Sequence, residues 1–287
     1  MIKQVCLVIK HKDARPAAIA REIIAHLKSR SVNVNQGAVS QKDEAIVVVG
    51  GDGTLLHVAA QAFQQGLPIL GINAGGLGFL TEVHTDEMQE ALDSLVENTF
   101  TLDRRMVLRV RVKDSDGRLK QEYIALNEAV ITKGALSKII RIESWVDGTF
   151  LTTYRGDGLI ISSATGSTGY NLSAGGPIMH PGLEAMILTP ICPFALSARP
   201  IILQGNSQVD IQVEESAEEV CLDVDGQAGL HLESSDRIEI GRMPGYLKLI
   251  KSPHRDYFTI LREKLGWTRG ISYPAGNTNK NAPGETG

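Results

Sequence analysis

Two kinds of hydrophobic pattern alternate over the first hundred residues of the chain. Apolar runs at Val5 to Ile9, Ala45 to Val49 and Leu67 to Ile72 predict buried strands. The segments between and after these runs carry apolar residues at helical spacing, which predicts helices over Pro16 to Arg30, Leu55 to Gln65 and Asp86 to Glu97. Alternation of strands and helices is typical of a parallel sheet covered by helices. We therefore expect an α/β domain over residues 1–100.

The pattern changes near Asp103 to the period of two that indicates strands. The predicted strands are Met106 to Lys113, Tyr123 to Ile131, Ile139 to Val146, Thr149 to Tyr154, Val209 to Val213, Val220 to Val224, Arg237 to Ile240 and Leu247 to Ile250. They predict a β-rich second domain over residues 101–250. Phe258 to Leu265 has helical spacing but is too short for a core of its own, so we expect it to pack on one of the two domains. Residues 271–287 are rich in Asn, Gly, Pro and Thr, which predicts a mobile tail.

Composition narrows the functional class. The net charge is −4, with 29 basic and 33 acidic residues mixed along the chain, so neither nucleic acid nor a membrane surface is an expected partner. The three cysteines are far apart, which argues against a disulfide framework and favours a reducing compartment. The chain enters a strand at once, without the pattern of a signal peptide, and no apolar stretch approaches the length of a membrane span. We expect a cytoplasmic protein.

A glycine-rich loop, Gly50-Gly51-Asp52-Gly53-Thr54, lies between a predicted strand and a predicted helix. Backbone amides at such a helix start can face a bound phosphate, and we expect Gly50, Gly51, Gly53 and Thr54 to bind one. The lysine of a P-loop and the third glycine of a dinucleotide fingerprint are missing. A plain strand-to-helix turn is the alternative.

A second glycine-rich stretch, Asn73 to Leu80, also follows a predicted strand. The carboxyl ends of neighbouring parallel strands meet at one edge of a sheet, where open α/β sheets bind ligands. We therefore expect the two loops to form a cleft. We assign its backbone to that cleft, and the side chains of Leu77, Phe79 and Leu80 to packing.

Polar residues in the second domain supply further candidates. Asn127 and Glu128 interrupt an apolar strand, so at least one of them meets core or ligand, unless the strand has a solvated face. Residues 156–170 place Asp157 between glycines and continue with hydroxyl side chains and Tyr170, which suits a flat nucleoside; a polar turn is the alternative. Asp225-Gly226-Gln227 predicts a hairpin turn, and His57 and Arg155 are more often surface residues than ligand contacts.

These motifs together resemble the bacterial NAD kinases. The resemblance covers nearly the whole chain, from the first glycine loop through Asn127-Glu128 and residues 156–170 to Leu196-Ser197-Ala198-Arg199-Pro200 and Lys264-Leu265-Gly266-Trp267. The first loop alone is weak evidence, since diacylglycerol kinases and phosphofructokinases carry similar loops. The resemblance implies a Rossmann-like first domain, a β-sandwich-like second domain, a terminal segment at 251–270 that returns to the first domain, and a homodimer or homotetramer whose subunits share the active site.

The resemblance also implies the reaction, in which ATP phosphorylates the 2′-hydroxyl of the adenosine ribose of NAD to give NADP. Asp52 is then the catalytic residue at that hydroxyl, beside Gly53. Asn127 and Glu128 hold the adenosine end of NAD, and Asp157 holds the nicotinamide end. The further NAD contacts that it implies are His57, Lys138, Arg155, Thr168, Gly169, Tyr170, Asn171, Leu172, Ser173 and Gln227. Arginine at position 155 goes with preference for NAD over NADH.

Phosphoryl transfer makes a modest demand on the carboxylate. In a loose transition state the proton of the nucleophile leaves late, so Asp52 need only orient the hydroxyl and accept the proton. Mg²⁺ held through phosphate oxygens and water needs no dedicated protein site, and we expect none, although Asp52 could instead contact the metal. A diacylglycerol-type lipid kinase and a non-catalytic dinucleotide sensor are the alternative functions, and the range of phosphoryl donors stays open.

Overall fold

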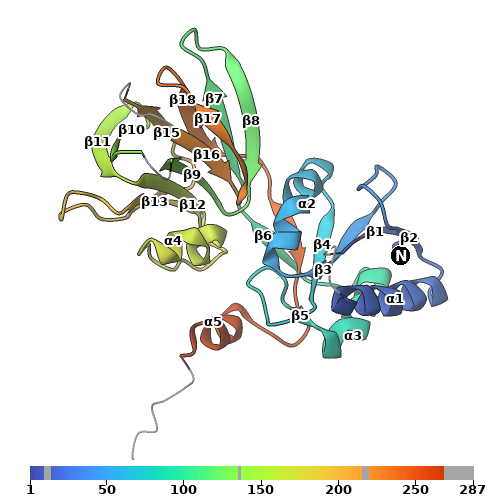
Figure 1. Cartoon of the computed structure of the whole chain (residues 1–287). Coiled ribbons are helices and arrows are strands. Elements are labelled where there is room, and N and C mark those ends of the chain that lie inside the picture. Colours follow the sequence, from blue (N-terminus) through green and yellow to red (C-terminus); the bar gives the residue numbers. More distant parts are fainter. Residues whose placement is uncertain (10–13, 135–136, 215–219, 268–287) are drawn as a thin grey trace, which may run out of the picture.

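The computed structural model describes residues 1–9, 14–134, 137–214 and 220–267 (Figure 1). The tail predicted over 271–287 and the last three residues of the predicted 251–270 segment lie outside this part. No helix within it is long and apolar enough to cross a membrane.

The first domain is built on a largely parallel sheet. Among the described residues, seven strands form it in the order β2-β1-β3-β4-β19-β6, with β5 beside β4. Apolar side chains of α1 and α3 pack on one face of the sheet, and those of α2 pack on the other. The strands are β1 Gln4–Ile9, β2 Asn33–Asn35, β3 Ala45–Gly50, β4 Pro68–Asn73, β5 Val83–His84, β6 Leu102–Arg105 and β19 Leu247–Ile250. The helices are α1 Ala14–Ser29, α2 Asp52–Gln65, the 3-10 turn η1 Thr85–Glu87 and α3 Met88–Glu97.

Strand β19 corrects the sequence-based prediction. The strand at Leu247–Ile250 exists, but it pairs with β4 and β6 of the first sheet rather than extending the second domain. Leu247 and Leu249 are buried in a cluster with α2, and Ile250 is buried on the opposite face. A four-residue apolar strand has the same pattern in either domain, so its partner depends on where the chain returns.

The second domain consists of two antiparallel sheets, each with six strands in the described part of the chain. Their orders are β11-β10-β15-β18-β7-β8 and β14-β13-β12-β9-β16-β17, and inward side chains of both sheets form one core. The strands of the first are β7 Leu108–Lys113, β8 Leu119–Ala125, β10 Ile140–Val146, β11 Thr149–Gly156, β15 Val209–Val213 and β18 Arg237–Arg242. Those of the second are β9 Glu128–Lys133, β12 Gly158–Ser163, β13 Ala185–Ile191, β14 Ile201–Gln204, β16 Val220–Val224 and β17 Gln227–Leu232. The α/β plus β-sandwich-like fold class is confirmed.

Two predictions about this domain are wrong. The single strand predicted over Tyr123 to Ile131 is two strands, β8 and β9, because the chain crosses from one sheet to the other at Leu126 and Asn127. The loop predicted over residues 156–170 begins instead as the fully buried strand β12, which pairs with β9 and β13 on either side. Gly158, Ser162 and Ser163 make up half of this strand, so the apolar pattern alone does not predict it as a core strand.

The carboxyl-terminal segment contacts both domains. Ser252 donates a hydrogen bond to Glu87 at 2.9 Å, and His254 lies 2.8 Å from Glu90 of α3. Helix α5, Tyr257–Leu265, follows and is capped by the Asp256 carboxylate, which accepts the N–H of Thr259. Figure 1 shows α5 between α4 of the second domain and β5 of the first. The sequence-based prediction named only the first domain.

Candidate active site

Asp52 stands at the start of α2, directly after β3, and its carboxylate holds the neighbouring loop. Within the described residues it accepts four hydrogen bonds, from the backbone N–H groups of Phe79, Leu80 and Thr81 at 2.9 to 3.1 Å and from the Thr81 hydroxyl at 3.1 Å. Oδ1 accepts three of them and Oδ2 accepts one. The two glycine-rich loops therefore meet as predicted, and Asp52 itself makes the contact. The backbone of 79–81 faces this carboxylate.

The glycines of the first loop leave open space at the helix start. Gly51 and Gly53 have no positive φ, and a Cβ added to either would meet no described atom within 4 Å. Neither backbone strain nor packing in the described chain therefore explains glycine at these positions. Helix α2 also begins without a side-chain cap from any described residue. An uncapped helix start beneath open space suits an anion that approaches the backbone closely.

The crossover between the two sheets forms the opposing wall. Asp225, in the turn between β16 and β17, accepts the N–H groups of Leu126, Asn127 and Glu128 at 2.7 to 3.0 Å. Leu126 is buried in one cluster with Leu55 of α2, so the crossover packs beside the helix that begins at Asp52. Asn127 lies in the crossover itself, and Glu128 is the first residue of β9.

Glu128 is a buried carboxylate with spare hydrogen-bonding capacity. Its side chain is buried, and Oε1 accepts the N–H of Tyr170 at 3.1 Å. Burial raises the pKa of Glu128 from 4.5 to about 7, while N–H groups of Tyr170 and Asn171 oppose the rise. Among the described residues, Glu128 Oε2, Asn127 Oδ1 and Thr165 Oγ1 are buried without a hydrogen-bond partner. Buried polar atoms are rarely left unpaired, so this corner suits a polar ligand.

The segment after β12 turns back over that corner as the 3-10 turn η2, Thr165–Thr168, and the short helix α4, Tyr170–Ser173. Its glycines are needed for close packing: a Cβ on Gly166 would lie 2.3 Å from the Asn127 carbonyl oxygen, and one on Gly169 would lie 3.2 Å from both Glu128 carboxylate oxygens. The side chains of this segment that reach its surface belong to Thr168, Tyr170, Leu172 and Ser173. Tyr170 is 44% exposed and can pack against a flat ligand.

Most of the predicted hydroxyl run serves the fold. The Ser163 hydroxyl bonds the Leu126 carbonyl oxygen, and the fully buried Ser167 bonds the Met179 backbone. Asn171 is also fully buried, with its amide bonded to the Ser167 and Pro177 carbonyl oxygens and to the Thr189 hydroxyl. The side-chain amide of Asn171 is thus taken up in fixing α4, and a ligand contact at this residue stays a prediction.

Comparison with known proteins decides the family. The ATP-NAD kinase N-terminal domain matches residues 6–100, and the ATP-NAD kinase C-terminal domain matches residues 126–252. The NAD kinase of Geotalea daltonii is 39% identical in an alignment of 282 positions that covers 93% of this chain and 99% of that protein. The NAD kinase of Moorella thermoacetica is 38% identical, in an alignment that covers 100% of both chains. The chain belongs to the ATP-NAD kinase family.

Solved structures of the ATP-NAD kinase family share this architecture. An NAD kinase from Archaeoglobus fulgidus in complex with ATP has a TM-score of 0.73 and 29% identity, over 91% of this chain and 99% of that one. Yeast NADH kinase complexed with NADH has a TM-score of 0.86 over 95% of this chain, and at 24% identity it supports the fold alone. The resemblance inferred from the motifs is confirmed, and the protein is an NAD kinase rather than a lipid kinase or a non-catalytic sensor.

The remaining predicted NAD contacts of this ATP-NAD kinase have varied settings. Asp157 is 43% exposed, with its carboxylate 3.6 Å from Lys133 Nζ, and the Arg155 guanidinium lies over the Phe194 ring. His57 and Lys138 are exposed. Gln227 lines a cavity of about 300 Å³ with Ala60 and Gln64 of α2. These positions stay predictions as ligand contacts.

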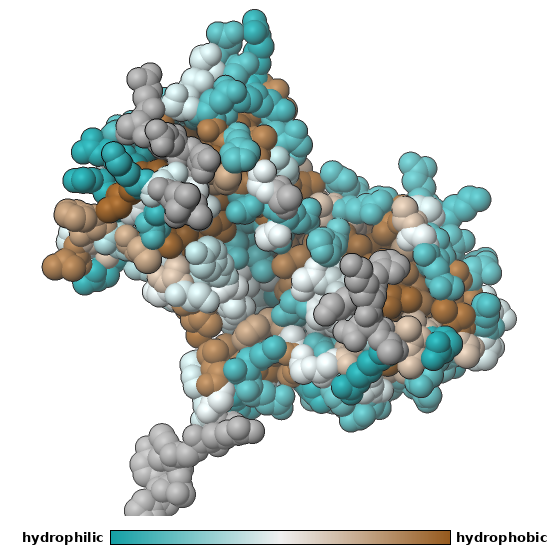
Figure 2. Space-filling model, in the orientation of Figure 1, coloured by the Kyte–Doolittle hydropathy of each residue, from teal (hydrophilic) through white to brown (hydrophobic). Residues whose placement is uncertain are grey.

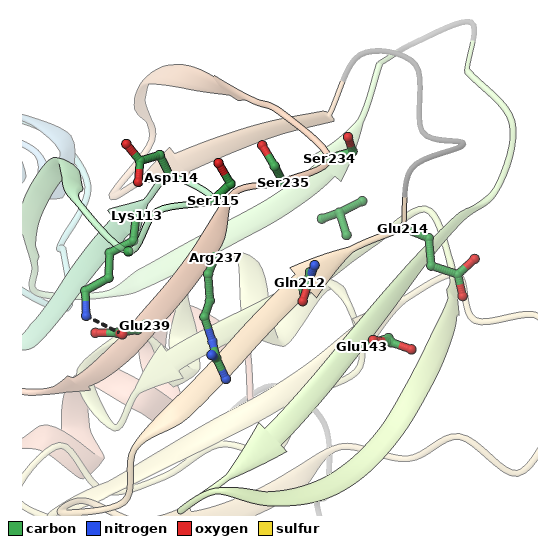
Figure 3. A pocket seen from close by; sticks show the side chains of 12 residues that line it. Lys113, Asp114, Ser115, Glu143, Gln212, Glu214, Ser234, Ser235, Arg237 and Glu239 are labelled. Carbon is green, nitrogen blue, oxygen red and sulfur yellow. Dashed lines mark hydrogen bonds and ion pairs between the residues drawn. The ribbon is translucent and has the colours of Figure 1, made fainter.

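A cavity of about 880 Å³ opens on the outer face of the first antiparallel sheet (Figure 3). Charged side chains of both signs line it, among them Lys113, Arg237, Glu143 and Glu239, with Lys113 paired to Glu239. Its described lining contains none of the residues predicted for the active site. The volume of this cavity therefore does not mark the active site of this ATP-NAD kinase.

Sequence reasoning missed three residues that shape the site. Asp225 was interpreted as part of a hairpin turn, which it is, with φ of 51° and Gly226 at 69°. Its half-buried carboxylate, whose pKa is raised by burial, also fixes the crossover about a hundred positions earlier in the chain. Thr81 donates to Asp52, and Tyr257 contacts both walls of the site. Proximity of residues this distant in sequence leaves no signal in one chain.

Proposed function

We propose that the protein transfers the γ-phosphoryl group of ATP to the 2′-hydroxyl of the adenosine ribose of NAD, with Asp52 as the residue at that hydroxyl. The nearly full-length match to NAD kinases carries the reaction. The position of Asp52 at an uncapped helix start, beside two glycines with open space above them, supports its role. The described relative with bound ATP supports ATP as the donor.

In this proposal Asp52 acts through Oδ2. Oδ1 is occupied by three donors from Leu80 and Thr81, whereas Oδ2 accepts one hydrogen bond and keeps a free lone pair. That lone pair can accept the proton of the ribose hydroxyl. The hydrogen bonds to 79–81 fix the direction in which it points, and fixed orientation is most of what a loose phosphoryl transition state asks of the base.

Mg²⁺ fits this donor set as a metal carried by ATP. No group of three or more His, Cys, Asp or Glu side chains in the described part of the chain could hold an ion. Mg²⁺ in phosphoryl transfer is commonly held by substrate phosphates, water and one or two carboxylates. Because the free lone pair of Asp52 Oδ2 is assigned to the ribose hydroxyl, the phosphates of ATP and water would hold the metal. When bound, the metal would neutralise charge on the phosphates.

The wall formed by the crossover and by η2 and α4 is the proposed dinucleotide side. Unpaired Asn127 Oδ1 and Glu128 Oε2 can bond ribose or adenine groups, and Tyr170 can cover a ring. Thr168, Gly169, Leu172 and Ser173 line the same surface in this proposal, and Asp157 and Arg155 lie toward the nicotinamide end.

Glu128 gives the protein a predicted pH dependence. Its folded-state pKa of about 7 exceeds its ordinary 4.5, so the native state holds a proton that the unfolded chain has released between these values. The stability that this proton contributes is fully present below pH 4.5 and is lost as pH rises through 7, with a magnitude of about 3 kcal/mol. Glu128→Gln cannot ionise. Its free energy of unfolding should therefore gain on wild type as pH rises from 5 to 8.

Urea denaturation across this pH range measures the effect. Glu122→Gln is the matched control, because Glu122 is exposed and loses the same charge without the burial. The control should run parallel to wild type over the range. A constant offset between Glu128→Gln and wild type would show that Glu128 does not hold the extra proton.

We also propose that the protein assembles as a homodimer or homotetramer and works in the cytoplasm. Phe194 and Leu196, in the loop after β13, are 66% and 93% exposed, and Figure 2 shows brown hydrophobic surface where this loop projects. Large exposed apolar side chains at a loop tip favour contact with another copy. Cys6 and Cys192 are free thiols, which suits a reducing compartment.

The test of the proposed reaction is incubation of the purified protein with NAD, ATP and Mg²⁺ and identification of the product. Replacing ATP by other nucleoside triphosphates or by polyphosphate in the same assay defines the donor. Replacing NAD by NADH measures the preference proposed for Arg155.

A further inference from the structure

Helix α5 supplies an aromatic residue that contacts both walls of the site. The Tyr257 ring lies 6.5 Å from the Phe79 ring, centroid to centroid, with 44° between the ring planes. Phe79 is also the residue whose N–H donates to Asp52 Oδ2 at 2.9 Å. Tyr257 is therefore one residue removed from the carboxylate oxygen that is proposed to act on the hydroxyl.

The hydroxyl of the same residue reaches the other wall. Tyr257 Oη donates to the Met179 carbonyl oxygen at 3.2 Å. That oxygen also accepts the Ser167 hydroxyl at 3.1 Å, and the Met179 N–H donates back to Ser167 Oγ at 3.0 Å. Ser167 is fully buried in η2, directly before the segment whose Tyr170 N–H bonds Glu128. The hydroxyl end of Tyr257 is thus tied to the dinucleotide wall.

The base of α5 is anchored independently of these contacts. Ser252 and His254 bond Glu87 and Glu90 at the start of α3, and the Asp256 carboxylate caps the helix. His180 packs edge-on against Tyr257, with ring centroids 5.1 Å apart. The start of α5 is therefore anchored to the first domain and the Tyr257 ring packs against His180. The ring of Tyr257 contacts the first domain at Phe79, and its hydroxyl contacts the second domain at Met179.

We propose that Tyr257 is a positioning residue that couples the dinucleotide wall to the loop that orients Asp52. Its ring fixes Phe79, and through it the 79–81 loop. Its hydroxyl fixes Met179, and through it η2 and α4. Displacement of either wall is transmitted to the other through one side chain. This inference rests on the proposed function, because the effect is exerted on NAD binding and on Asp52.

The two ends of Tyr257 make separable predictions. Tyr257→Phe keeps the ring beside Phe79 and loses the hydrogen bond to Met179, so KM for NAD should rise about 3- to 10-fold, the usual effect of one lost hydrogen bond, while kcat stays within about 2-fold of wild type. Tyr257→Leu also removes the aromatic contact, so kcat should fall as well, by about 10-fold, because the loop that orients Asp52 loses its support.

Steady-state kinetics of both variants, with thermal unfolding to establish that each is folded, is the test. Tyr246→Phe is the matched control, since it loses a tyrosine hydroxyl bond to Glu184 outside the site and should leave both constants unchanged. Phe79→Leu combined with Tyr257→Leu completes a double-mutant cycle, in which the two losses of kcat should be strongly non-additive.

The outcomes distinguish this inference from the proposed function. If wild type forms no NADP, the proposed function fails. If wild type is active but folded Tyr257→Phe and Tyr257→Leu show its KM and kcat, the coupling is wrong. Equal losses of kcat in both tyrosine variants, or additive losses in the cycle, would also overturn it, since either result means that the ring contact with Phe79 does not carry the effect.

Discussion

Asp52→Asn should lower kcat for NADP formation by at least about 100-fold, the usual scale for loss of a positioned acid or base, while NAD binding changes little. Asparagine keeps the size of the side chain but removes the charge and one acceptor oxygen. Either position of the new NH2 group is costly: at Oδ2 it removes the proposed acceptor of the hydroxyl proton, and at Oδ1 it removes the acceptor that holds Leu80 and Thr81.

Thr81→Val separates these two effects. Valine has nearly the same shape and removes only the hydroxyl that donates to Asp52 and accepts from Asn73. The backbone hydrogen bonds to Asp52 remain, so kcat should fall only by about 2- to 5-fold, in line with loss of one of the four hydrogen bonds to the carboxylate. Titration calorimetry with NAD and initial rates measure both variants. Unchanged kcat in Asp52→Asn would remove this carboxylate from the chemistry.

Gly78→Ala should also lower kcat, by at least about 10-fold, without any change to Asp52 itself. A Cβ at position 78 would lie 2.1 Å from Asp52 Oδ1 and 2.4 Å from Thr81 Oγ1, so the carboxylate or the loop must move. Gly78 has no positive φ, so the expected effect comes from space alone. NAD binding should be less affected, because the crossover and α4 are untouched.

Gly76→Ala is the matched control in the same loop. A Cβ there meets no described atom within 4 Å, and its φ is not positive. It should leave Asp52 undisturbed and keep nearly wild-type kcat, and any effect of the added methyl group on the cleft should appear in KM for ATP or NAD. Both kcat and the unfolding temperature are measured for the two variants and for wild type. A folded Gly78→Ala variant as active as Gly76→Ala would contradict the account of how Asp52 is oriented.

The bounds of several strands could be predicted from the sequence, whereas the sheet in which each strand pairs could not. The strand at Val220–Val224 was predicted with its observed bounds, because a strand pattern is local. Leu247–Ile250 was also predicted with its observed bounds but placed in the wrong domain, because pairing depends on where distant chain segments meet. The crossover at Leu126 and Asn127 was hidden for the same reason, since two polar residues between apolar runs do not show whether the chain changes sheets there.

In the candidate site, too, single residues could be predicted from the sequence but their contacts could not. Asp52 could be singled out from its glycine neighbours, but the bonds to 79–81 could not, because they join residues almost 30 positions apart. The glycines of the two motifs looked alike in sequence and differ in structure. Gly51 and Gly53 leave space open, whereas Gly166 and Gly169 admit the neighbouring chain. Serine and asparagine at 163, 167 and 171 suggested ligand contacts, yet their partners are backbone and side-chain groups of the protein.

Phosphoryl transfer to the 2′-hydroxyl is tested most directly by the product that the wild-type protein forms from NAD, ATP and Mg²⁺. One ADP should be released for each NAD consumed, and phosphorus NMR should place the added phosphate on the 2′-oxygen of the adenosine ribose. Folded protein that binds NAD and leaves it unphosphorylated, or that phosphorylates another position, would contradict it.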